Sequence, residues 1–222
     1  KETWTSGDTL DGKEGNDILN IQTGIAMVNP TLNLTSIETV NVNSTTTVAL
    51  NGSAWDGTNT LNVTKATAAT LTAAATTDVN VSGISVVDGN ISVKGGKNII
   101  INDTKAGGDI TIGDNTVVAG DATGTITITD TNNATGVNGN DILVSGGTDV
   151  TVTTTADKAS SGDITIGHAT NGMATGNVVV TQNTTSNGTA AITAGDVTVT
   201  GGKTVEITAN MNYNGKAVRT VK

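Results

Sequence analysis

The chain of 222 residues has no cysteine, no phenylalanine and one proline, and its aromatic residues are two Trp and one Tyr. Without cysteine the chain has no disulfide, no thiol catalysis and no thiolate metal site. A globular enzyme usually fills its interior with aromatic and Leu side chains. Here the apolar residues are mainly Val, Ile and Ala. This composition favours thin layers of β-structure over an enzyme core.

Charge is also scarce, because Asp, Glu, Lys and Arg together make up 14% of the residues. Low charge, little proline and many β-branched residues argue against a disordered chain. The formal net charge is −9, which argues against binding to nucleic acid or to an anionic membrane surface. The negative net charge is compatible with the binding of cations, above all calcium. No run approaches the roughly 20 apolar residues of a membrane helix, so we predict no membrane span.

What the chain does contain is pervasive alternation of apolar with Thr, Asn or Ser residues. Such a period of two predicts short strands with one apolar face, and the Gly, Asn and Asp between them predict turns. Examples are "TVNVN" (39–43), "TLNVT" (60–64), "DVNVS" (78–82), "DITIG" (109–113), "TITIT" (125–129), "DVTVT" (149–153), "DITIG" (163–167) and "DVTVT" (196–200).

A longer repeat appears in the second half. The segments "VKGGKNIII", "VSGGTDVTV" and "VTGGKTVEI" align on Gly95, Gly146 and Gly201, which are 51 and 55 residues apart. The first ninety residues share the strand pattern without this register. We therefore divide the chain into an N-terminal segment, 1–88, and a C-terminal segment, 89–222, with a repeat of about 53 residues.

Two architectures fit a repeat of short strands that buries its apolar face only against its neighbours. One is a parallel β-solenoid, or β-helix-like stack, filled by Val and Ile ladders. The other is an array of small antiparallel sandwiches, although a sandwich normally takes about 100 residues. We predict an all-β parallel β-solenoid. Strand recurrences near 18–20 and near 26–28 residues predict coils of irregular length.

The run "GKEGNDIL" (12–19) follows the pattern G-x-x-G-x-D-x-L, close to the nonapeptide of calcium-binding parallel β-rolls. Glycines permit a tight turn, and an Asp supplies the hard oxygen that calcium prefers. Gly12, Gly15 and Asp17 fill the ligand positions. Asp8 lies nine residues before Asp17, which is the nonapeptide step. The sequence thus predicts RTX-like turns and a calcium site formed by Asp8, Gly12, Gly15 and Asp17.

A second copy, "GVNGNDIL" (136–143), places Gly136, Gly139 and Asp141 in the same positions. Here the next Asp follows after eight residues, so the nine-residue step is lost. Its "NDILVSGG" half also belongs to the longer repeat. In both copies the alternative is a Gly-Asn-Asp turn that binds no metal, with Asp capping backbone amides. Of the two, the N-terminal copy is the better calcium candidate.

Together, "SGDTLDGKEGNDIL", "LTSIETVNVN" and "GTNTLNVT" resemble segments of bacterial surface-layer proteins of the RTX-related class that is exported by type I secretion. That resemblance covers composition along the whole chain and specific phrases within residues 1–64. It implies an extracellular protein in which calcium orders the subunits and drives a two-dimensional lattice on the cell surface. The implied partners are copies of the chain itself, and a cell-surface polysaccharide bound through a region outside these residues.

We therefore expect a non-enzymatic structural component of a surface layer, as part of a longer protein, with calcium as its ligand. The alternative is the stalk of a secreted repetitive adhesin. A β-helical polysaccharide-active enzyme and an ice-binding domain are less favoured, since the chain lacks the aromatic platform of a sugar cleft and its Thr-x-Thr runs are ordinary strand residues.

Overall fold

The computed structural model describes residues 6–86, 89–104, 108–114, 120–132, 139–157, 160–168, 172–186, 192–213 and 219–220. Every pair of strands in these ranges is parallel, and no element is an α-helix. The chain is an all-β parallel β-solenoid, as the alternation predicts, and the antiparallel sandwiches are not formed. Nor do the described residues contain a helix long and apolar enough to cross a membrane.

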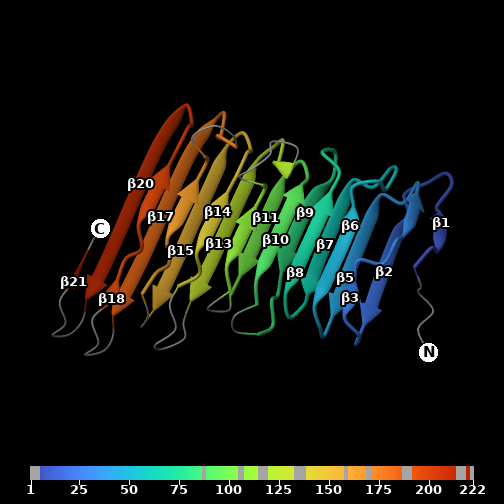
Figure 1. Cartoon of the computed structure of the whole chain (residues 1–222), viewed down its shortest axis with the longest axis horizontal. Coiled ribbons are helices and arrows are strands. Elements are labelled where there is room, and N and C mark those ends of the chain that lie inside the picture. The colour runs from blue at the N-terminus through green and yellow to red at the C-terminus, as the bar shows by residue number, and fades with distance from the viewer. Residues whose placement is uncertain are drawn as a thin grey trace.

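One sheet of nine strands runs the length of the molecule (Figure 1). In spatial order it contains β2 (Ile18–Thr23), β5 (Thr39–Ser44), β7 (Thr60–Lys65), β9 (Asp78–Ser82), β11 (Ile99–Asp103), β13 (Ile126–Asn132), β15 (Val150–Asp157), β17 (Asn177–Ser186) and β20 (Thr204–Tyr213). Spatial order follows chain order, because each pass of the chain adds one strand beside the previous one.

A second sheet of eight strands accompanies the first. It contains β3 (Met27–Val28), β6 (Val48–Gly52), β8 (Ala69–Ala73), β10 (Ile91–Gly95), β12 (Ile110–Ile112), β14 (Ile142–Val144), β16 (Ile164–Ile166) and β19 (Val197–Val199). Two short pairs complete the described strands: β1 (Thr9–Asp11) with β4 (Asn33–Thr35), and β18 (Ile192–Thr193) with β21 (Arg219–Thr220). We call one strand of the nine-stranded sheet and the strand of the eight-stranded sheet that follows it a coil.

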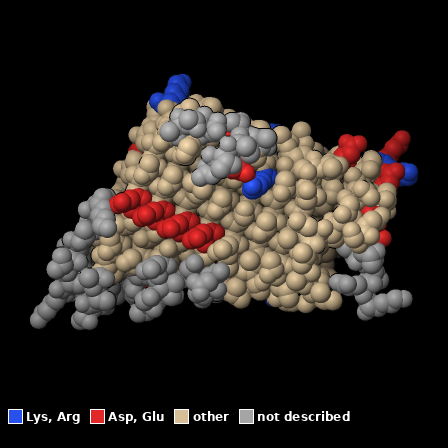
Figure 2. All heavy atoms as spheres, viewed as in Figure 1, with Lys and Arg blue, Asp and Glu red and all other residues tan. Residues whose placement is uncertain are grey.

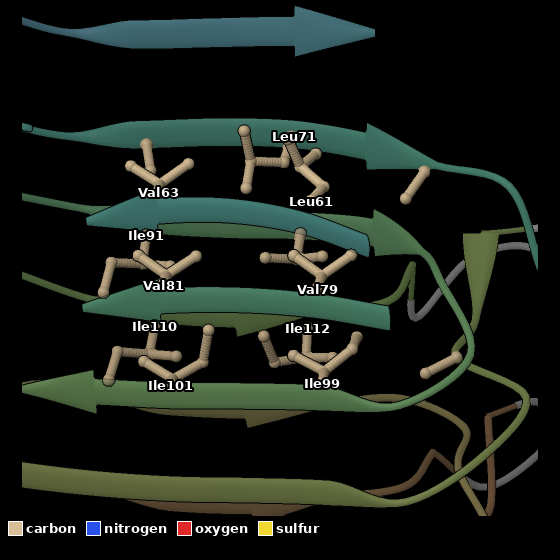
Figure 3. Packing of buried hydrophobic residues seen from close by; sticks show 14 of the residues in the cluster. Leu61, Val63, Leu71, Val79, Val81, Ile91, Ile99, Ile101, Ile110 and Ile112 are labelled. Carbon is tan, nitrogen blue, oxygen red and sulfur yellow. The ribbon is translucent and has the colours of Figure 1, made fainter. Parts of the chain in front are cut away.

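The core is a set of apolar columns between the two sheets. Leu61 pairs in register with Val79, which pairs with Ile99, and Val63, Val81 and Ile101 form the next column. These side chains face those of β8, β10 and β12 (Figure 3). Each is at most 1% exposed, whereas Ile100, on the outer face of β11, is 50% exposed. The alternation in the sequence therefore places apolar side chains, most of them β-branched, in one buried layer between the sheets.

Coil length varies along the stack, as the recurrences predict. Thr60 pairs with Asp78 across a step of 18 residues, whereas Val150 pairs with Val178 across a step of 28. The repeat of about 53 residues is two coils, because β10 and β14, which carry its first two copies, are separated in the sheet by β12. Extra residues are accommodated between the strands, so the register of the columns is kept.

Pairing between β8 and β10, and between β9 and β11, joins the N-terminal and C-terminal segments of the solenoid. The division at residue 88 remains a prediction from sequence register. The RTX-like form of the turns likewise remains a prediction. Glycine is required at the repeat's own turn, where Gly146 and Gly147 both have φ of 84°, a left-handed conformation that side chains with a Cβ disfavour.

Candidate functional site

Three of the predicted calcium positions come together in the turn between β1 and β2. A Cβ added at Gly12 would lie 2.8 Å from Asp17 Oδ2 and 1.9 Å from the carbonyl oxygen of Ser36. At Gly15, where φ is 132°, a Cβ would lie 3.7 Å from the same Oδ2. Gly12 therefore leaves the space that the Asp17 carboxylate and the Ser36 carbonyl occupy, whereas Gly15 supplies a positive φ that residues with a Cβ disfavour.

The next coil supplies a second carboxylate to this turn. The amide nitrogen of Asp17 donates a hydrogen bond of 2.7 Å to Oε2 of Glu38, which precedes β5. Asp17 Oδ2 itself is shielded from solvent and makes no hydrogen bond with any residue that the structure describes. A shielded carboxylate oxygen without a donor is costly unless a cation or a proton compensates it. We call Asp17, Glu38, Gly12 and Gly15 the N-terminal turn site.

Asp8 lies beside β1, and its backbone carbonyl accepts a hydrogen bond of 3.0 Å from the amide of Asn33 in β4. The apolar residues that follow the two aspartates by two positions, Leu10 and Leu19, both pack against the core, as the nonapeptide pattern requires. Within the described ranges, however, no three His, Cys, Asp or Glu residues are grouped so that they could hold one metal ion. Calcium binding by Asp8, Gly12, Gly15 and Asp17 remains a prediction.

In the second candidate turn, Gly136 lies outside the described residues. Gly139 is packed against the neighbouring coil, since a Cβ there would lie 2.2 Å from the amide nitrogen of Gly162. Asp141 is exposed and precedes β14. Calcium binding by Gly136, Gly139 and Asp141 remains a prediction. The side chain of Asp141 also belongs to an arrangement that the sequence analysis did not predict, a row of aspartates that runs from coil to coil.

This acidic row consists of Asp109, Asp141, Asp163 and Asp196, each directly before a strand of the eight-stranded sheet. In each coil, Oδ1 of one aspartate accepts a hydrogen bond from the backbone amide of the next, at 3.2, 2.9 and 2.8 Å along the row. All four side chains are exposed. Figure 2 shows a diagonal line of acidic side chains across this part of the surface. Stacked strands lie about 4.8 Å apart, so the row concentrates negative charge.

Sequence reasoning missed this row, although a signal for it was present. A small or polar residue, an aspartate and then an apolar strand recur as "GDITI", "NDILV", "GDITI" and "GDVTV". The glycine before the aspartate allows close stacking, because a Cβ at Gly195 would lie 2.1 Å from the carbonyl oxygen of Gly162.

A second group of polar residues lies inside the solenoid, near the carboxyl ends of the strands. Asp103, Asp130 and Thr154 follow one another in adjacent strands of the nine-stranded sheet, and all three are buried. Burial, the nearby charge of Asp103 and a hydrogen bond from Asn140 act on Asp130, and the net effect raises the pKa of its carboxyl group to about 7. The sequence analysis did not include Asp103 or Asp130 among the predicted site residues.

No family model, no curated protein and no solved structure matches the chain. The chemistry that the described side chains offer is therefore read from their geometry alone. Carboxylate, hydroxyl and carbonyl oxygens gather at the N-terminal turn site, along the acidic row and in the interior, and such oxygens are the ligands of hard cations.

Proposed function

We propose that this chain is a structural segment of a secreted bacterial surface-layer protein, in which calcium orders the first coil and promotes contacts between neighbouring copies. The observation that carries the proposal is the N-terminal turn site. There the solvent-shielded Oδ2 of Asp17 lies over Gly12 and Gly15, and Glu38 of the next coil holds the Asp17 amide.

Calcium would act through linkage between binding and folding. The turn site contains residues from two successive coils, so an ion held there stabilises the stacked arrangement and has no comparable site in the unfolded chain. An ion present at 100 times its dissociation constant stabilises the folded state by about 2.7 kcal/mol. Because β2 pairs with β5 along six residues, an ordered first coil also presents a regular edge to the rest of the stack.

The experiment is thermal unfolding of the full chain in calcium chloride and in EGTA, followed by circular dichroism. We expect a higher Tm in calcium, and an Asp17→Asn variant should lose part of this increase. Asp56→Asn, which removes an exposed carboxylate elsewhere in the early coils, is the matched control and should keep it. Equal Tm values for the wild type in both conditions would contradict the role of calcium.

Lattice formation is tested separately by negative-stain electron microscopy. A surface-layer segment should form periodic sheets in calcium and lose them with EGTA. The second candidate, an adhesin stalk, is favoured by the uninterrupted elongated stack of Figure 1 and needs no lattice. A stalk should remain monomeric in both conditions, which sedimentation velocity measures directly.

A further inference from the structure

Two buried carboxylates lie in the C-terminal segment of the solenoid. Asp103 ends β11 and pairs in register with Asp130 of β13, so the two side chains lie on adjacent rungs of the same inward face. Asp103 is 1% exposed and Asp130 is 3% exposed. Two carboxylates are therefore neighbours in a region that is shielded from bulk solvent.

The surroundings of Asp130 stabilise its negative charge only in part. Asn140 donates a hydrogen bond of 2.7 Å from Nδ2 to Asp130 Oδ1, which favours the charged form. Burial opposes that form, and so does the carboxylate of Asp103 on the adjacent strand. Among the described residues, none of the groups that act on Asp130 is basic. An ionised Asp130 thus calls for a positive charge close to it.

The next strand supplies a neutral oxygen, the hydroxyl of a buried threonine. Thr154 of β15 pairs in register with Asp130, on the side opposite Asp103. Thr154 is 5% exposed, and its Oγ1 has no hydrogen-bond partner in the part of the chain that the structure describes. Valine has the same shape and would fill this position without burying a polar group. Packing alone therefore does not explain why position 154 carries a hydroxyl group.

We propose that Asp103, Asp130 and Thr154 form an interior binding site for one divalent cation of the calcium class. All three side chains project from one face of one sheet, on consecutive strands, and their oxygens are the hard ligands that such ions select. Two ionised carboxylates balance the charge of one divalent ion. The hydroxyl of Thr154 then acts as a neutral ligand from the third strand.

This interior site is separate from the N-terminal turn site and from the acidic row. It lies within one chain and in the C-terminal segment, so its occupancy requires neither a lattice nor an intact Asp17. Binding of the ion would join three consecutive coils, β11–β12, β13–β14 and β15–β16, through one centre. The expected consequence of binding is a stiffer stack over these three coils.

The test is calcium binding by the full chain at pH 7.5, measured by equilibrium dialysis for stoichiometry and by titration calorimetry for affinity. Asp130→Asn should bind one calcium ion fewer than the wild type. Thr154→Val should bind the same ion at least tenfold more weakly, although in EGTA it should unfold at a Tm no lower than that of the wild type. Asp17→Asn should retain the interior ion.

Unchanged stoichiometry and affinity in both Asp130→Asn and Thr154→Val would overturn the proposal. So would a wild-type chain whose Tm responds to pH but not to calcium, because a proton alone would then occupy the pair. If Asp130→Asn fails to fold, the near-isosteric Thr154→Val decides. Loss of calcium binding in Asp17→Asn alone would support the N-terminal turn site and count against the interior one.

Discussion

Replacing Asp130 with asparagine should stabilise the folded chain at neutral and alkaline pH when divalent ions are removed. Asparagine has the shape of the protonated acid, and its amide oxygen can still accept the hydrogen bond from Asn140 Nδ2. The substitution therefore keeps the neutral side chain that the buried position favours and removes the carboxylate that it disfavours.

The magnitude follows from the pKa of Asp130, which is raised from its ordinary value of 3.8 to about 7 in the folded chain. Below pH 3.8 the carboxyl is protonated in both states, and its contribution to stability is complete. Between pH 3.8 and about 7 the unfolded chain ionises first, so the free energy of unfolding falls as pH rises. At 1.36 kcal/mol per pH unit, the total loss is about 4 kcal/mol. Above pH 7 no further loss occurs.

Asp130→Asn should lack this loss. At pH 8 it should be more stable than the wild type by up to about 4 kcal/mol, or roughly 8–16 °C in Tm for a chain of this size, whereas the two should agree near pH 4. Thermal unfolding by circular dichroism in EGTA, from pH 4 to pH 8.5, measures this difference. Asp56→Asn is the control, because its carboxylate is exposed. A variant with the wild-type pH slope, or one less stable at pH 8, would refute the reasoning.

Three further outcomes are expected. Gly12→Ala places a Cβ 1.9 Å from the carbonyl oxygen of Ser36, so we expect the first coils to separate. Amide hydrogen exchange should then become faster in β1 and β4 and stay unchanged in β15. Ile101→Ala should lower the free energy of unfolding, measured with urea, by about 2–5 kcal/mol, because the Ile101 side chain is 1% exposed. Ile100→Ala, on the outer face of the same strand, should lower it by less than about 0.5 kcal/mol. Asp163→Asn removes one negative charge from the acidic row and keeps an oxygen that can accept the hydrogen bond from the Asp196 amide. It should therefore raise Tm slightly at low ionic strength and leave Tm unchanged in 1 M salt. An equal increase of Tm in both conditions would argue against charge repulsion along the row.

Most of the fold follows from the sequence, because alternation identifies both the strands and the face that they bury. In β5, β7 and β9 the apolar residues at every second position are the buried ones. Shared Gly-Gly turns also identify the longer repeat. The sequence did not show that this repeat is two coils, since one repeat and one coil both begin with an apolar strand, and only the pairing of β12 between β10 and β14 separates them.

The candidate sites were harder to predict, for a reason that is specific to solenoids. Neighbours in space are residues one coil apart, and coil length is not constant. Asp109 and Asp141 are 32 residues apart, and Asp141 and Asp163 are 22 apart, yet each pair shares a hydrogen bond. A fixed nonapeptide step directs attention to aspartates within one coil, such as Asp8 and Asp17. The acidic row and the interior pair instead connect successive coils.

The interior carboxylates are also not needed for the stack itself. On β13 the inward positions carry Ile126 and Ile128 before Asp130, and on β11 Ile99 and Ile101 precede Asp103, so a third apolar residue would continue each series. Replacing buried ionic groups by packed apolar ones is often neutral or stabilising in proteins. We therefore expect two adjacent carboxylates and a buried hydroxyl to lower the free energy of unfolding relative to an apolar interior. A bound divalent cation would offset that cost, and the chain would then couple the order of its C-terminal segment to the ion concentration around it.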